Sequence, residues 1–68
     1  MEIDHRLAER VKAFRRQKGW SQEELGHQAG LHRTFISQVE RRKKNTTIYS
    51  VEKIAIALGV TMGELLDG

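Results

Sequence analysis

The organisation of this chain is clearest in residues 21–41, which read SQEELGHQAGLHRTFISQVER. Ser21 is a preferred N-cap residue, and a glutamate three positions later completes the pattern of a capping box. Gly30 then interrupts the helical pattern, as a glycine able to adopt positive φ commonly does at a helix end. The segment therefore predicts two short helices, over about residues 22–29 and about residues 33–41.

Three features of this segment meet the demands of a steep crossing between the two helices. The helices nearly touch, so the contact position in the first must be small, and it is Gly26. The turn needs a residue that tolerates positive φ, which Gly30 supplies. The second helix needs branched apolar residues to pack on the first, and these are Ile36 and Val39. A turn this short cannot place the helices antiparallel, so the segment predicts a helix-turn-helix.

Amphipathic runs on both sides predict three further helices. Apolar residues recur at helical spacing over about residues 4–18, and Thr47 would cap a helix over about 48–58. Residues 60–65 repeat the capping box and open a short last helix. No segment alternates like a β-strand, so we expect an all-α domain of five helices that occupies residues 1–68.

Composition limits what so short a chain can be. Sixty-eight residues make one domain with a thin core, and the absence of cysteine excludes disulfides and thiolate metal sites. Good helix geometry or self-association must then supply stability. The longest apolar run, residues 54–58, is far too short to cross a bilayer, and the acidic, polar start does not resemble a signal peptide. We therefore expect a cytoplasmic protein with no membrane contact.

Positive charge is concentrated in the middle of the chain. Residues 32–44 carry five basic side chains and one acidic, whereas residues 1–31 have a net charge of +1 and residues 45–68 one of −2. This distribution is typical of a protein that binds a polyanion. A solvated helix end without a partner explains the charge alone equally well. The basic run at 41–44, RRKK, could also be a localisation signal, although phosphate contact is its simpler role beside a helix-turn-helix.

Polar side chains occupy the face of the second helix of the motif that is opposite Ile36 and Val39. They are Arg33, Thr34, Ser37 and Gln38. In a major groove, an arginine can pair with guanine and a glutamine with adenine, each through two hydrogen bonds. Any surface helix has a polar face. This face, however, belongs to the segment in which Gly26, Gly30 and the capped start at Ser21 predict a helix-turn-helix, and this favours a role in reading bases.

Four motifs carry a resemblance to a known family: SQEEL at 21–25, AGL at 29–31, ISQVER at 36–41 and IAIALGV at 54–60. With them, nearly the whole chain resembles the lambda-repressor-like helix-turn-helix family of the Xre or Cro/cI type. HRTFIS at 32–37 and NTTI at 45–48 are in addition similar to the controller proteins of restriction–modification systems. Those proteins are small dimeric activator-repressors without an effector domain.

The resemblance implies a dimeric regulator of transcription that binds double-stranded DNA, and it implies roles for particular residues. The base-reading positions are Arg33, Thr34, Ser37 and Gln38. The positions that hold the DNA backbone are Gln22, Lys43, Lys44, Asn45 and Thr47. We add Phe35, which could instead pack in the core but is expected to lie partly exposed against sugars and thymine methyl groups.

The resemblance also implies an internal ion pair between Arg15 and Glu40, which would join the first helix to the end of the third. Two positions depart from the family pattern. Gly26 replaces the usual alanine, at a cost of roughly 1 kcal/mol in helix propensity. Threonine stands at 46 where many members carry proline, which predicts a more flexible loop.

Self-association is expected through the last helix and the end of the one before it. Val60, Met62, Leu65 and Leu66 are more apolar side chains than so short a helix needs to cover a thin core. A two-fold dimer would bury the surplus and present two recognition helices to a palindromic operator, with half-site centres roughly 34 Å apart.

Other functions fit the sequence less well. His27 and His32 have no cysteine beside them to complete a metal site, and no phosphate-binding loop or acid–base pair predicts an enzyme. We therefore expect no metal, cofactor or small-molecule ligand. Two alternatives stand beside the main hypothesis: a protein-interaction module of the antitoxin or transcription-bridging type, and an excised DNA-binding domain of a longer repressor.

Overall fold

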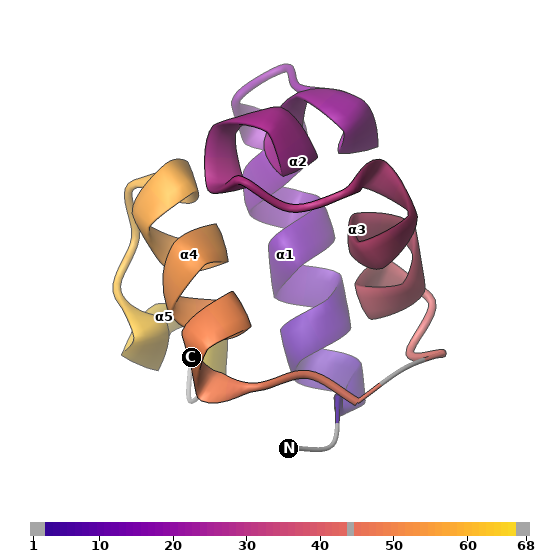
Figure 1. Ribbon diagram of the computed structural model, residues 1–68. Helices are drawn as coiled ribbons and strands as arrows, with labels where there is room; N and C mark the ends of the chain where they lie inside the picture. Colours follow the sequence, from indigo (N-terminus) through magenta and orange to yellow (C-terminus); the bar gives the residue numbers. More distant parts are fainter. Residues whose placement is uncertain (1–2, 44, 67–68) are drawn as a thin grey trace.

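The computed structural model describes residues 3–43 and 45–66, and every regular element among them is an α-helix (Figure 1). The helices are α1 (His5–Gln17), α2 (Gln22–Ala29), α3 (Arg33–Glu40), α4 (Ile48–Leu58) and α5 (Met62–Leu66). The predicted bounds of α2 and α4 are correct to the residue, and α3 ends one residue earlier than predicted. The expectation of a five-helix, all-α fold is confirmed.

Side-chain caps explain why the helices begin where they do. The Ser21 hydroxyl accepts a hydrogen bond from the backbone N–H of Glu24 at 3.0 Å, and the Thr47 hydroxyl accepts one from Ser50 at 3.2 Å. Before α5, the capping box is reciprocal. Glu64 N–H donates to the Thr61 hydroxyl at 3.0 Å, and Thr61 N–H donates to the Glu64 carboxylate at 2.9 Å. These bonds satisfy backbone donors that a helix start leaves without partners.

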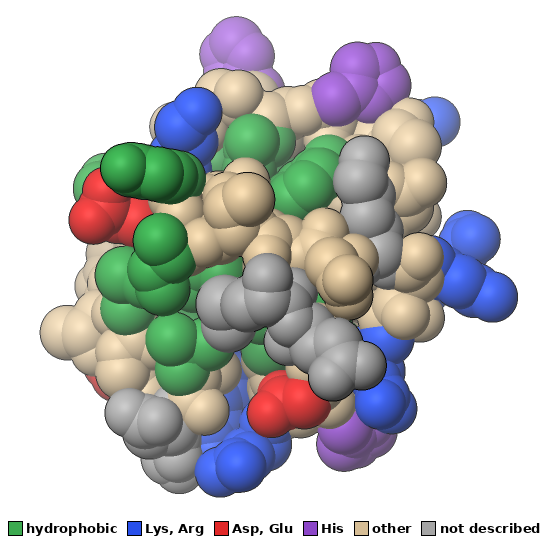
Figure 2. Space-filling view, turned by 60° about the horizontal axis from the view of Figure 1, so that its bottom comes forward, with side chains coloured by type: hydrophobic (Ala, Val, Ile, Leu, Met, Phe, Trp, Pro, Cys, Tyr) green, Lys and Arg blue, Asp and Glu red, His purple; other side chains and the backbone are tan. Residues whose placement is uncertain are grey.

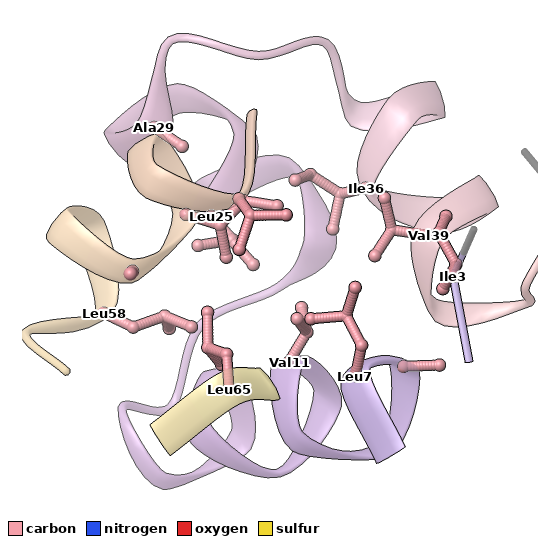
Figure 3. Packing of buried hydrophobic residues seen from close by; sticks show 13 residues of the cluster. Ile3, Leu7, Val11, Leu25, Ala29, Ile36, Val39, Leu58 and Leu65 are labelled. Atoms are coloured by element: carbon pink, nitrogen blue, oxygen red, sulfur yellow. The ribbon is translucent and has the colours of Figure 1, made fainter. Parts of the chain in front are cut away.

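The core lies between α1 and the other four helices. Leu7 and Val11 on α1 point toward Leu25 on α2 and toward Ile36 and Val39 on α3 (Figure 3). From the other side, buried side chains of α4 and α5 complete the same cluster. One apolar cluster joined to all five helices fixes their relative positions, which is what a recognition helix requires.

The turn between α2 and α3 depends on the missing side chain at position 26. A Cβ built on Gly26 would lie 2.6 Å from the carbonyl oxygen of Leu31, well inside van der Waals contact. The two residues are also joined through their backbones, since Leu31 N–H donates to the Gly26 carbonyl at 2.8 Å. Gly30 between them has φ of 70°, the left-handed conformation expected of it. The turn is therefore packed directly against the backbone of α2.

None of the five described helices combines the length and the apolar character needed to span a membrane. Figure 2 shows an uneven surface: hydrophobic side chains gather on the left of that view, and several Lys and Arg side chains project from its right edge.

Candidate DNA interface

The recognition helix α3 is held by its two branched apolar residues. Ile36 and Val39 are completely buried, at 0% and 1% exposure, so the opposite face of α3 is turned outward. On that face Arg33 and Thr34 are exposed, while Ser37 and Gln38 are half-buried. The structure therefore places all four predicted base-reading residues on one accessible surface.

These residues line a polar hollow at the surface of the domain. Its lining consists of Gln22, Arg33, Thr34, Ser37, Gln38 and Arg41. Gln22 comes from the start of α2, so the hollow brings the predicted phosphate contact beside the predicted base readers. Arg41 was predicted only as part of a basic run. Its spacing of four from Ser37 and eight from Arg33 places it on the same helical face, and this spacing could have identified it.

Histidine caps the recognition helix. The Nδ1 atom of His32 accepts a hydrogen bond from the backbone N–H of Thr34 at 3.0 Å. A neutral imidazole whose Nδ1 accepts carries its proton on Nε2. His32 therefore serves as the N-cap of α3, a position usually occupied by Ser, Thr, Asp or Asn.

The ion pair between Arg15 and Glu40 is present in the structure. Arg15 Nε donates to Glu40 Oε2 at 2.7 Å, and Arg15 Nη2 donates to Oε1 at 3.0 Å. The Glu40 side chain is only 1% exposed and that of Arg15 11%. The hydrogen bond from Glu40 raises the pKa of Arg15 above its ordinary value, although burial acts in the opposite direction. This contact fixes the end of α3 to α1.

Two further bonds connect the ion pair with the start of α2. Arg15 Nη1 donates to the carbonyl oxygen of Trp20 at 2.8 Å, and the Gln22 amide donates to Glu40 Oε1 at 3.2 Å. Gln22 therefore has a partner inside the protein as well as a place in the hollow. The ends of α1, α2 and α3 nearest the hollow are thus held in one hydrogen-bonded network.

Apart from Phe35 on α3, the other residues predicted to contact the DNA backbone lie in the loop between α3 and α4. Lys43, Asn45 and Thr47 are exposed, and Lys44 lies outside the described residues. The Thr47 hydroxyl is engaged as the cap of α4. Phe35 is partly buried and packs against the core cluster, so only part of its ring is available at the surface.

The predicted dimer surface needs one correction. Leu65 is 0% exposed, because α5 turns this side chain into the core against α1 and α4, and it cannot contact a second copy. Val60, Met62 and Leu66 are only partly buried. Ile56, which the sequence pattern did not indicate, is 72% exposed on α4, because the buried stripe of that helix faces away from it. We call Ile56, Val60, Met62 and Leu66 the α4–α5 patch.

In this structure two helices, α2 and α3, cross steeply, and α3 presents a polar face beside the capped start of α2. This arrangement defines a helix-turn-helix DNA-binding domain. Comparison with known proteins supports this assignment to the helix-turn-helix class. The helix-turn-helix family HTH_3 matches residues 11–65. A hypothetical transcription factor from Neisseria meningitidis is 52% identical over 60 residues, which is 88% of this chain and 57% of the relative's length. This chain belongs to the helix-turn-helix family.

Two solved structures are similar to this chain over nearly all of their own length. The restriction–modification controller protein C.AhdI from Aeromonas hydrophila is 34% identical, with a TM-score of 0.87 over 91% of this chain and 94% of that chain. SinR, a biofilm regulator solved in complex with DNA, is 35% identical, with a TM-score of 0.85 over 90% of this chain and 98% of that chain. The resemblance to lambda-repressor-like proteins that the motifs predicted is thereby confirmed.

Proposed function

We propose that this protein regulates transcription as a dimer that binds duplex DNA and reads bases through α3. The observation that carries the proposal is the polar hollow, which is lined by four residues of α3, by Gln22 of α2 and by Arg41. The Arg15–Glu40 ion pair joins the end of α3 to α1 beside it. The SinR structure with DNA supports it, since a domain of the same fold is bound to DNA there.

Base reading falls to the exposed side of α3. Arg33, in the first turn, would pair with the O6 and N7 acceptors of a guanine, and Gln38 with N6 and N7 of an adenine. Thr34 and Ser37 would add hydroxyl or methyl contacts to neighbouring base edges. A polar face of this kind argues against a protein-interaction module, which would usually present an apolar patch there.

The DNA backbone would be held on either side of that face. Gln22 stands at the N-terminus of α2, where the helix dipole and unpaired backbone N–H groups favour a phosphate. Lys43, Lys44, Asn45 and Thr47 would follow the phosphates along the exit from α3. The edge of Phe35 would lie against the sugars.

The α4–α5 patch would join two copies about a two-fold axis. Ile56 is exposed and Val60, Met62 and Leu66 are partly exposed in the monomer. A symmetric contact would cover these apolar side chains on both copies. The two α3 helices would then enter successive major grooves of a palindromic operator, roughly 34 Å apart. Because its target is DNA, we place the protein in the cytoplasm.

The genes it controls are proposed to be those of a restriction–modification system. C.AhdI supports this, because the similarity extends over nearly all of both chains. The test is to select binding sites from a random DNA pool and compare them with the sequence upstream of the protein's own gene. Recovery of a palindrome in that region, beside methyltransferase and endonuclease genes, is the expected result. A pool that yields no preferred sequence would contradict specific binding.

A further inference from the structure

Arg42 has a backbone conformation that arginine rarely adopts. Its φ is 57°, and it is the one non-glycine residue with positive φ within residues 3–43 and 45–66. The conformation closes α3, because Arg42 N–H donates to the Val39 carbonyl at 3.1 Å and Lys43 N–H donates to that of Gln38 at 2.8 Å. This is the hydrogen-bond pattern of a Schellman motif, whose left-handed position is usually a glycine.

The chain itself uses glycine for this purpose elsewhere. Gly30 after α2 and Gly59 after α4 occupy the same left-handed region, with φ of 70° and 74°. A side chain in that region brings Cβ too close to the following carbonyl oxygen, which glycine avoids. Stability alone would therefore place glycine at 42 as well. The helix that enters the DNA groove ends instead on a strained arginine.

Local interactions do not explain the arginine. A cation near a helix C-terminus is favourable, but Arg41 and Lys43 adjoin this one already, and a third positive charge adds mutual repulsion. Arg42 is exposed, and within the part of the chain that the structure describes its side chain has no ion pair. In the sequence Arg42 stands between Arg41, which lines the hollow, and Lys43, which is exposed.

We propose that Arg42 contacts a DNA phosphate at the edge of the groove, and that this chain keeps a strained residue there to increase affinity at the expense of fold stability. The inference rests on the proposed function. It differs from an ordinary basic contact, because it predicts that one substitution changes stability and DNA affinity in opposite directions.

The experiment compares Arg42→Gly with wild type by thermal unfolding and by binding to a random-sequence duplex long enough for two half-sites. Relief of strain should raise Tm by roughly 4–8 °C. Loss of one phosphate contact should weaken binding about eightfold per subunit at about 0.1 M salt, and should lower the slope of log K against log salt by about one per subunit. Arg42→Lys retains charge and strain and should differ little from wild type in either measurement.

Two control variants separate this inference from the proposed function. Arg16→Ala removes an exposed arginine of α1 that does not line the hollow, and it should leave binding unchanged. Lys43→Ala should weaken binding without raising Tm. If Lys43→Ala weakens binding and Arg42→Gly does not, or if Arg42→Gly fails to raise Tm, the role of Arg42 is wrong while DNA binding stands. If wild type binds no duplex, the proposed function fails, and the inference fails with it.

Discussion

The guanidinium of Arg15 meets the carboxylate of Glu40 through two hydrogen bonds, of 2.7 and 3.0 Å, although 25 residues separate them in the chain. Glu40 is the last residue of α3, and Arg15 lies in the last turn of α1. Because Gln22 also donates to Glu40, the same carboxylate connects the start of α2 to both helices. The orientation of the recognition helix therefore depends on one buried acidic group.

Removal of Arg15 should be strongly destabilising. Arg15→Ala leaves the Glu40 carboxylate buried without its main partner, and we expect a loss of about 3 kcal/mol in the free energy of unfolding. Urea denaturation followed by circular dichroism measures it. Glu40→Gln, which removes the buried charge together with the pair, should cost less. A loss below about 1 kcal/mol for Arg15→Ala would show that the pair behaves like an exposed one.

This contribution should be insensitive to pH over the working range. A group whose pKa is raised on folding contributes stability that is complete below its unfolded pKa and lost only above its folded pKa. The pKa of Arg15 is raised from an already high value. The stability difference between wild type and Arg15→Ala should therefore stay constant between about pH 7 and about pH 10. A difference that falls steadily across this range would contradict the assignment.

Alanine should be unfavourable at position 26 despite its higher helix propensity. Propensity alone would favour Gly26→Ala by roughly 1 kcal/mol, whereas the new Cβ would clash with the Leu31 carbonyl, and overpacking of this kind costs typically 1–3 kcal/mol. Because the new Cβ would meet a backbone carbonyl rather than a flexible side chain, the turn itself would have to shift. We expect a net loss of stability and weaker DNA binding. If thermal unfolding showed Gly26→Ala to be more stable than wild type, the turn would accommodate the added methyl group at little cost.

Features that depend on a few adjacent residues could be predicted from the sequence. Ser21 and Thr47 cap α2 and α4 as predicted, because a cap depends on a few adjacent residues. Leu65 was misassigned, because the face of a helix as short as α5 that meets α1 is decided by tertiary packing. The exposure of Ile56 could not be predicted, because an apolar residue outside the buried stripe of a helix gives no periodic signal. The strain at Arg42 is visible only in the backbone.

The proposed dimer contact through the α4–α5 patch predicts different results for substitutions of Ile56, which belongs to the patch, and Leu65, which lies in the core. Ile56→Lys should give a monomer in sedimentation at tens of micromolar with little change in Tm, because this side chain is 72% exposed. Leu65→Ala should instead cost about 2–5 kcal/mol of stability, as truncation of a core leucine does. Ile48→Lys is the matched control at the other end of α4 and should stay dimeric. An Ile56→Lys dimer of unchanged strength would exclude the α4–α5 patch.

The most direct test of base reading by α3 is a set of binding isotherms for Arg33→Ala on the operator and on a scrambled duplex, across a salt series. We expect a loss of roughly 1–3 kcal/mol per half-site on the operator alone, with relaxed preference at one base pair. Lys43→Ala, as the comparison, should weaken both duplexes and reduce the salt slope by about one unit per subunit. Equal weakening of both duplexes by Arg33→Ala would show that α3 does not read bases through this residue.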